Sequence, residues 1–290
     1  MNKITVVGGG LAGCEAAWQT ANRGIYTEII EMKPGKKTPA HKSDLLAELV
    51  CSNSLKAARI DSAAGLLKEE MRRFSSLCLF AADKCSVAAG GALAVDRDAF
   101  SGIITEKIKN HPLIKVTEGV VTEIPRGGVC VIATGPLTDT ELAECIAELC
   151  DGGNLSFYDA AAPIVTAESI DMEKAFYASR YGRGTDDYIN CPMNKEEYTA
   201  FYNELVSAET APLHKFDRNI TVYEGCMPVE VLAKRGEDSI RFGPLKPVGL
   251  KDPRTGHRPW AAVQLRRENA AATLFNLVGF QTNLKFPEQE

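Results

Sequence analysis

A strand–glycine–helix–strand pattern over residues 3–32 constrains the fold of this 290-residue chain more than any other feature. The β-branched run at residues 4–7 is typical of a buried parallel strand. Alanines at helical spacing follow the glycines, Gly24 ends the predicted helix, and residues 26–30 form a second strand. A helix that joins two parallel strands in this way predicts an α/β, Rossmann-like domain.

Three glycines at the turn of this unit match the spacing G-x-G-x-x-G. Gly8 allows a tight turn, Gly10 lets a pyrophosphate approach the backbone, and Gly13 lets the helix pack closely on the strand. Glu31 ends the second strand, where an acid accepts hydrogen bonds from a ribose hydroxyl and disfavours a 2′-phosphate. FAD or NAD therefore fits better than NADP. The predicted cofactor-binding residues here are Gly8, Gly9, Gly10, Leu11, Ala12, Gly13 and Glu31.

A second glycine turn follows a predicted strand within residues 127–137, which ends in Ala133-Thr134-Gly135. Flavoproteins with two dinucleotide sites often have such a strand and turn where the chain returns to the FAD. By itself the pattern fits any junction between a strand and a loop. Together with the N-terminal glycines it favours FAD, and it adds Gly135 to the predicted cofactor site.

Composition places the chain among ordinary globular proteins, with 45% apolar and 24% charged residues. There is no run of eighteen apolar residues and no signal-peptide layout at the N-terminus, so we expect a cytoplasmic protein without a membrane span. The nine cysteines include no C-x-x-C pair, which argues against both a disulfide framework and a zinc site. We therefore predict no metal.

The rest of the chain divides into two predicted domains. Helices are expected at residues 62–77, from Asp96 or Asp98 to 108, at 137–149 and at 195–209, and strands at 114–124, 219–224, 239–242, 259–266 and 272–279. Within the first of these helices, Leu66, Leu67, Met71 and Phe74 are expected to share one apolar side. The late helix followed by short strands fits an inserted α+β domain. The prediction is an FAD-binding domain at residues 1–185 and an inserted domain at residues 186–290.

Two of the cysteines lie in predicted loops. Cys51 stands in "AELVCSNSL" between an apolar run and a polar patch, and Cys226 stands in a turn between Gly225 and Pro228. A loop can give a thiol the access and the thiolate character that a nucleophile needs. The ordinary alternative is a small buried hydrophobic residue, and the residue pattern leaves both interpretations open. We expect Cys14, Cys130, Cys145 and Cys150 in the core, because they lie on predicted helices or strands.

Residues 241–267 carry seven lysines and arginines against one acid, Asp252, although the whole chain has a net charge of −5. Such segregation of charge is typical of a surface that binds a polyanion, and equally of a solvated sheet face. Trp260 within this segment could stack on a base or fill the core. The candidate nucleic-acid-binding residues are Lys246, Lys251, Arg254, Arg258, Arg266 and Arg267.

Long phrases throughout the chain resemble one family. They include "GGGLAGCEAAWQ", "TPAHKSDLLAELVCSNSLK", "AAGGALAVDRDAFS", "EGCMPVEVLAKRG", "RFGPLKPVGLKDPRTG" and "LFNLVGFQT". In this order they are similar to the N-terminal two-thirds of the folate- and FAD-dependent tRNA uracil-5 methyltransferases, the TrmFO family. Members of that family continue beyond the position that matches Glu290.

The resemblance implies methylation of uracil C5 in the T-loop of tRNA by a cytoplasmic enzyme. It implies 5,10-methylenetetrahydrofolate as the methylene donor, FAD as the redox cofactor and NADH or NADPH as the reductant. By phrase, the family's two functional cysteines match Cys226, taken as the thiolate that adds to uracil C6, and Cys51, taken as an auxiliary thiol. These two roles could be reversed. Two alternatives stay open: a tRNA- or flavin-binding chain without catalysis, and a related flavin and folate protein that modifies the tRNA wobble uridine.

Overall fold

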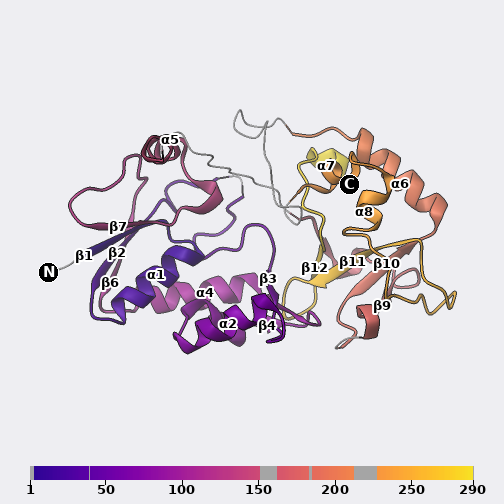
Figure 1. The fold of residues 1–290 in the computed structure, drawn as a ribbon, viewed down its shortest axis with the longest axis horizontal. Helices are drawn as coiled ribbons and strands as arrows, with labels where there is room; N and C mark the ends of the chain where they lie inside the picture. Colours follow the sequence, from indigo (N-terminus) through magenta and orange to yellow (C-terminus); the bar gives the residue numbers. More distant parts are fainter. Residues whose placement is uncertain (1–2, 39, 151–161, 183–184, 212–226, 290) are drawn as a thin grey trace. The chain divides into compact units, whose positions relative to one another are not determined.

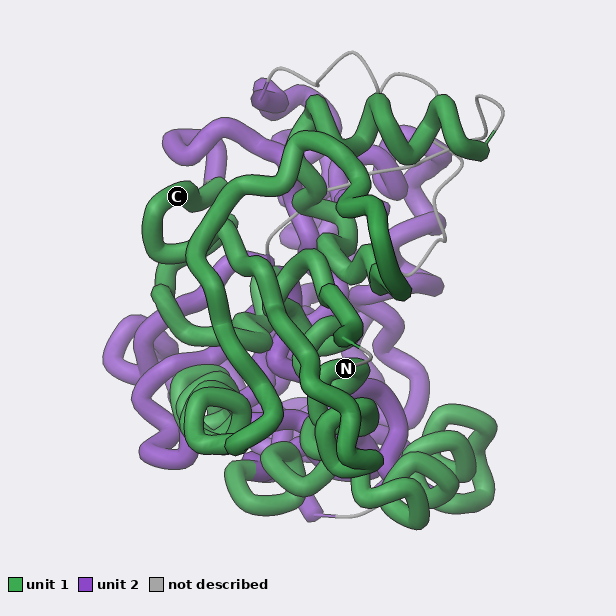
Figure 2. Tube along the Cα trace, turned by 90° about the vertical axis from the view of Figure 1, so that its left-hand side faces the viewer, with its two compact units in different colours: residues 1–50, 60–85, 96–159 green, residues 51–59, 86–95, 160–290 purple. Residues whose placement is uncertain are grey.

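The chain folds into two compact units. The structure, a computed structural model, describes residues 3–38, 40–150, 162–182, 185–211 and 227–289 (Figure 1). Unit 1 comprises Met1–Val50, Ile60–Cys85 and Asp96–Asp159, and unit 2 comprises Cys51–Arg59, Ser86–Val95 and Ala160–Glu290 (Figure 2). Each unit therefore draws on segments that are far apart in the sequence.

Unit 1 is built on a four-stranded parallel sheet in the order β6-β2-β1-β7. Its strands are β1 (Lys3–Val7), β2 (Tyr26–Glu31), β6 (Ile114–Glu118) and β7 (Val129–Ile132). Helices α1 (Leu11–Ala21) and α4 (Arg97–Lys109) pack on this sheet and on each other (Figure 1). A central β1 flanked by parallel strands, with α1 as the crossover, confirms the predicted Rossmann-like α/β fold.

Aspartate side chains cap the starts of two helices in unit 1. Asp96 caps α4, because its side chain accepts the backbone N–H of Ala99. Asp139 caps α5 (Thr140–Leu149) by accepting the N–H of Glu141. A carboxylate at the N-cap satisfies an otherwise unpaired N–H and complements the helix dipole.

The single helix predicted over residues 62–77 is wrong. The segment forms α2 (Ala63–Arg73), and a second helix, α3 (Leu77–Lys84), follows it. The break occurs because Ser75 adopts a positive φ of 56° and Ser76 caps α3 by accepting the N–H of Leu79. The expected apolar side is also wrong, since Phe74 is 66% exposed and two leucines of α2 are about half exposed, whereas Lys68 is buried.

Unit 2 is an α+β unit with two antiparallel sheets. The larger sheet has the order β8-β12-β11-β10-β9, and the smaller has the order β3-β5-β4. The strands are β3 (Ser54–Ala57), β4 (Ser86–Val87), β5 (Ala92–Val95), β8 (Ile164–Thr166), β9 (Phe176–Tyr177), β10 (Ile189–Met193), β11 (Ala261–Arg267) and β12 (Leu274–Leu277). The helices are α6 (Lys195–Ser207), α7 (Val229–Ala233), α8 (Glu237–Arg241) and α9 (Phe286–Gln289).

Helix α6 closes the main core of unit 2. Asn194 and Glu197 form a reciprocal capping box at its start, with each side chain accepting the other's backbone N–H. Tyr198 on this helix is fully buried and packs in a cluster with Ile240 and Leu245. The cluster buries the apolar faces of α6, α7 and α8 together, which stabilises three short helices that would not form in isolation.

Three expectations for this region have different outcomes. Residues 239–242 are not a strand, because Gly236, with a positive φ of 143°, is the N-cap of α8, and this helix buries Ile240. The strand predicted at 219–224 lies outside the described residues. The predicted boundary between residues 185 and 186 differs from the observed division, because β8 and β9 pair in the same sheet as β10–β12. Within the described residues, no helix is long and apolar enough to cross a membrane.

Candidate functional site

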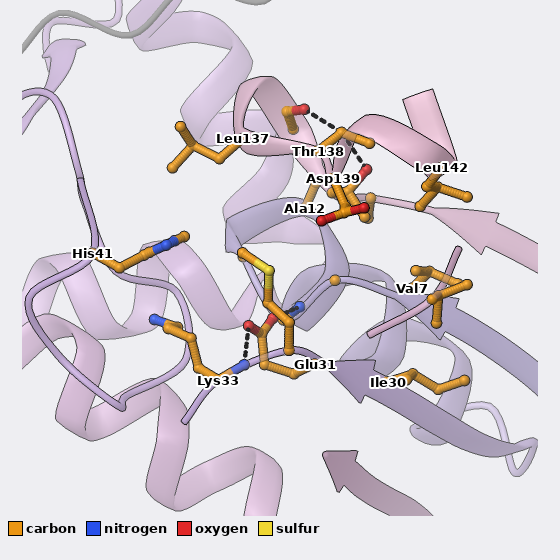
Figure 3. Close-up of a pocket in the computed structure, with 18 of the residues that line it drawn as sticks. Val7, Ala12, Ile30, Glu31, Lys33, His41, Leu137, Thr138, Asp139 and Leu142 are labelled. Atoms are coloured by element: carbon orange, nitrogen blue, oxygen red, sulfur yellow. Dashed lines mark hydrogen bonds between the residues drawn. The ribbon is translucent and has the colours of Figure 1, made fainter. Parts of the chain in front are cut away.

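A pocket of about 290 Å³ lies in unit 1 at the carboxyl ends of β1 and β2. Its walls come from the β1–α1 turn, from the segment that follows β2, and from the turn after β7. Figure 3 shows Glu31 and Lys33 on one side of it and Thr138 and Asp139 on another. In open parallel sheets, ligands bind outside the carboxyl ends of the strands. This pocket is therefore the candidate cofactor site.

The three fingerprint glycines have distinct structural roles. Gly8 has a φ of +98°, and a Cβ there would lie 2.7 Å from the carbonyl oxygen of Ala133. A Cβ on Gly13 would lie 1.9 Å from the carbonyl oxygen of Gly8, so α1 packs against the turn itself. A Cβ on Gly10 would meet no protein atom within 4 Å. The space beside Gly10 is therefore open to a ligand.

The N-terminus of α1 faces this pocket. Gly10 is the N-cap and carries no side chain to bond the first turn, and Leu11 and Ala12 line the pocket. The first N–H groups of a helix and the positive end of its dipole attract a phosphate. The cradle at Gly10 and this helix end together fit the pyrophosphate of a dinucleotide.

Glu31 connects β2 to the glycine turn. Its Oε2 accepts the N–H of Gly9 at 2.5 Å, and its Oε1 accepts the N–H of Lys33 at 3.0 Å. The residue is only 6% exposed, yet it lines the pocket. Since each carboxylate oxygen can accept more than one hydrogen bond, the side chain retains capacity for a ribose hydroxyl.

Several pocket residues were not predicted from the sequence. Lys33 is buried, and its Nζ donates to the carbonyl of Leu45 at 2.6 Å and to Glu48 at 2.9 Å. Asp139 lines the opposite wall and pairs with Lys36, and this hydrogen bond lowers the pKa of the Asp139 carboxyl. No spacing in the sequence identifies these residues, because they lie in irregular segments that only the fold brings to the pocket. Predicted Gly135 does line it, on the turn after β7.

Cys51 lies in unit 2 and not in the pocket. It is half buried in the loop that precedes β3, and Gln281 Nε2 lies 4.0 Å from its Sγ. Cys226, the other predicted catalytic thiol, lies outside the described residues. The described segment that follows it begins with buried Met227, and the N–H of Val229 donates to the carbonyl of Gln281 at 2.8 Å.

A buried polar network holds the loop that contains Cys51. Asn53 is fully buried and uses both amide hydrogens, donating to the carbonyls of Val95 at 3.0 Å and Arg267 at 2.8 Å. Its Oδ1 accepts from Arg266 Nε at 3.0 Å, and Arg266 Nη2 donates to Ser52 Oγ at 2.8 Å. A buried network whose amide and guanidinium groups are paired in this way favours one backbone conformation.

The network extends to β12. Asn276 is 1% exposed, and its Nδ2 donates to Asn53 Oδ1 at 2.9 Å and to Glu268 Oε2 at 2.6 Å. Arg266 is 6% exposed within it. The predicted role of Arg266 in nucleic-acid binding is therefore corrected: its guanidinium is directed inward, where it holds Ser52 and Asn53.

The other cationic candidates differ in exposure. Lys251, Arg254 and Arg258 are exposed, whereas Lys246 and Arg267 are partly buried. Arg254 forms a two-pronged hydrogen bond with Asp252, at 3.1 Å and 2.8 Å, which raises the pKa of the guanidinium. Three exposed basic residues, Lys251, Arg254 and Arg258, thus lie in the loop before β11.

Trp260 packs with the core. Its ring lies against the cluster around Tyr198, and the guanidinium of Arg241 covers it at 3.8 Å from the ring centre. Arg241 also donates to the carbonyl of Trp260. Of the two alternatives, Trp260 therefore packs with the core, and the Arg241 guanidinium covers one face of its ring.

The remaining cysteines differ in burial. Cys14 and Cys78 are buried in unit 1, and burial raises both pKa values, that of Cys14 to about 12. Cys130 and Cys145 are partly buried, and Cys150 is exposed at the end of α5. The expected core position of Cys150 is wrong, because only Leu142 of α5 is buried. Among the described residues, no group of three or more potential metal ligands is found.

The profile of one protein family, described as "Glucose inhibited division protein A", matches residues 3–290. The chain belongs to the glucose inhibited division protein A (GidA) family. Within the GidA family, the chain is 60% identical over 287 residues to the methylenetetrahydrofolate–tRNA-(uracil-5-)-methyltransferase TrmFO of Acetivibrio thermocellus, covering 99% of this chain and 66% of that protein. It is 60% identical over 290 residues to the TrmFO of Desulfitobacterium hafniense, covering 100% and 66%.

These relatives confirm the resemblance to TrmFO, and the chain spans about 66% of their length. Solved structures of GidA from Aquifex aeolicus are similar in fold. The form II crystal has a TM-score of 0.66 at 15% identity, covering 99% of this chain and 51% of that one. The form I crystal has a TM-score of 0.63, also at 15% identity, covering 99% and 53%.

Proposed function

We propose that this chain provides the FAD-binding unit and the cysteine-bearing unit of a folate-dependent methyltransferase that acts on uracil C5 in the T-loop of tRNA. The observation that carries the proposal is the 60% identity with TrmFO proteins over nearly the whole chain. The glycine turn, the α1 N-terminus and Glu31 support it, since they form a site suited to a dinucleotide.

In the proposed enzyme, unit 1 binds FAD. The open space at Gly10 and the first turn of α1 receive the pyrophosphate, and Glu31 accepts a hydrogen bond from the ribose. Gly8 and Gly13 keep the turn and the helix close enough to form this cradle. Bound FAD, reduced by NADH or NADPH, would supply the reducing equivalents that convert the methylene group of 5,10-methylenetetrahydrofolate to a methyl group.

The cysteines activate the pyrimidine. Uracil C5 is a poor nucleophile until a thiolate adds to C6, which forms an S–C6 bond and moves electron density onto C5. After the new carbon is attached to C5, a base would remove the C5 proton while the bond from that carbon to its carrier breaks. A hydride would then add to the exocyclic carbon, which makes the methyl group, and the electron pair returned to C5 would break the S–C6 bond so that the thiolate leaves. We assign the addition to Cys226 and an auxiliary role, such as that base, to Cys51. The reverse assignment is the alternative that the test below separates.

The tRNA backbone meets the exposed cations of unit 2. Lys251, Arg254 and Arg258 are accessible to phosphates, whereas Arg266 is not. Contacts of this kind add affinity without reading sequence, and they weaken as salt rises. We propose that these three residues belong to the tRNA-binding surface, in a protein that acts in the cytoplasm.

The test is to incubate the chain with FAD, NADH, 5,10-methylenetetrahydrofolate and an unmodified tRNA, and to analyse the nucleosides by mass spectrometry. The proposal predicts 5-methyluridine in the T-loop, and none when cytosine replaces the target uracil. It also predicts loss of product in Cys226→Ala, with a smaller loss in Cys51→Ala. Flavin binding without methylation would favour a tRNA- or flavin-binding chain, and an anticodon product would favour the wobble-uridine alternative.

A further inference from the structure

Gln281 contacts two segments of unit 2 that are far apart in the sequence. Its side-chain Nε2 lies 4.0 Å from Cys51 Sγ, and its backbone carbonyl accepts the N–H of Val229 at 2.8 Å. Cys51 and Gln281 are 230 residues apart in the sequence. The glutamine therefore joins the loop of Cys51 to the start of α7, which lies shortly after Cys226 in the sequence.

The backbone around Gln281 is held firmly. Glu230 on α7 is 1% exposed, and its two oxygens accept from Thr282 Oγ1 at 3.0 Å and from the N–H of Asn283 at 2.8 Å. With the Val229 contact, three consecutive residues of this segment are attached to α7. The main chain that carries the Gln281 side chain is thus anchored to α7.

Hydrogen bonds also hold the loop that contains Cys51. Arg266 on β11 bonds Ser52 and Asn53, the two residues that follow the thiol. An N–H directed at sulfur favours the thiolate over the thiol, because it stabilises the charged form.

We propose that Gln281 is a positioning residue for Cys51, whose amide orients the sulfur and favours its thiolate. The purpose of this positioning rests on the proposed function, since an auxiliary thiol that acts as a base must be deprotonated and correctly oriented. The effect of the Gln281 amide on the Cys51 thiol rests on the geometry alone. Nothing in the glycine fingerprint or in the two cysteine phrases indicates a role for this residue.

The test measures the thiol itself and does not depend on methylation. The purified chain is alkylated with iodoacetamide between pH 6 and pH 10, and the modification rate of Cys51 is measured by peptide mass spectrometry. In Gln281→Leu the rate at pH 7.5 should fall about threefold to tenfold, with the midpoint of the pH profile moving up by about half a unit to one unit. Gln281→Glu should lower the rate at least tenfold, because a carboxylate opposes a thiolate.

Two controls separate positioning from general loss of structure. Gln289→Leu removes an exposed amide near the same end of unit 2 and should leave the Cys51 profile unchanged. Gln281→Asn retains the amide on a shorter side chain and should restore part of the reactivity that Gln281→Leu loses. Gln281→Glu is nearly isosteric with glutamine, so it provides a folded variant even where the leucine destabilises the unit.

An unchanged Cys51 profile in both Gln281→Leu and Gln281→Glu would overturn the proposal. The same holds for an equal shift in Gln289→Leu, which would mean that the effect is not local. If the alkylation profiles shift as expected but the wild-type chain makes no 5-methyluridine, the proposed function fails and the role of Gln281 stands. If methylation occurs and the profiles do not shift, the role of Gln281 fails and the proposed function stands.

Discussion

Glu31 accepts the backbone N–H of Gly9 at 2.5 Å, which ties the end of β2 to the glycine turn that follows β1. The second oxygen of the same carboxylate accepts the N–H of Lys33 at 3.0 Å. The acid at this position therefore shapes the candidate cofactor site. Two parallel strands and the turn between them are fixed by one side chain.

Replacing Glu31 with glutamine should weaken both the fold of the turn and FAD binding. A glutamine has one acceptor oxygen, so its NH₂ group would face one of the two N–H donors. We expect the free energy of unfolding to fall by about 2 kcal/mol, the scale of a lost hydrogen bond to a charged group. FAD affinity should fall about tenfold, measured by fluorescence titration at a temperature where the variant is folded. Equal affinity in wild type and variant would contradict the role of the carboxylate.

Replacing Gly13 with alanine should destabilise unit 1 directly. The added Cβ would lie 1.9 Å from the carbonyl oxygen of Gly8, a backbone atom that cannot move without displacing the turn. We expect a loss of about 3 kcal/mol in urea unfolding, as for an overpacked core. Gly102→Ala on α4 is the matched control, because its Cβ would meet no atom within 4 Å. A stable Gly13→Ala variant would mean that α1 does not pack as described.

Substitutions of the basic residues of unit 2 should affect either the stability of the unit or its binding to tRNA. Arg266→Leu removes the donor to Ser52 Oγ and one of the two donors to Asn53 Oδ1, so the free energy of unfolding should fall by about 3 kcal/mol. Arg258→Ala removes an exposed side chain and should change stability by less than about 0.5 kcal/mol. In a tRNA binding assay, Arg258→Ala should instead reduce the salt dependence of binding by about one phosphate contact. If Arg258→Ala destabilised the unit as much as Arg266→Leu, the assignment would be wrong.

Thiol reactivity should follow burial in unit 1. Burial raises the pKa of Cys14 to about 12, so this thiol stays protonated as the pH rises from 7 to 10. Cys78 is buried as well, with its pKa raised by the same cause. Exposed Cys150 should therefore be alkylated readily, while Cys14 and Cys78 stay protected until the unit unfolds. Modification of Cys14 in the native chain at pH 8, at the rate seen for Cys150, would contradict the buried position.

The glycine fingerprint could be predicted from the sequence because its constraints are local. A positive φ at Gly8 and a close contact at Gly13 act within six residues, and the flanking apolar runs identify the strands. The helix break at Ser75 was not predictable in this way, since a serine at positive φ gives no pattern in the sequence. The same applies to residues 239–242, where the short alternation Ser-Ile-Arg-Phe fits either a strand or the helix that forms.

The surroundings of Cys51 lie beyond what a sequence pattern can show. Its loop is held by Arg266, and its sulfur is contacted by Gln281, residues more than 200 positions away. A run of arginines near β11 looked like a surface for nucleic acid, and the alternation of the strand turned one of them inward. Such assignments depend on tertiary packing, which determines the face that each strand residue occupies.

The most direct test of the account is an FAD titration of the wild-type chain and of Gly10→Val, followed by flavin absorbance and fluorescence. The Cβ added at Gly10 would meet nothing within 4 Å beyond its chain neighbours, so the variant should stay folded to within about 1 kcal/mol. The account predicts a bound flavin in the wild-type chain and at least a tenfold weaker affinity in Gly10→Val. Equal affinity in the two proteins, or no flavin bound by the wild-type chain, would contradict the assignment of this pocket to FAD.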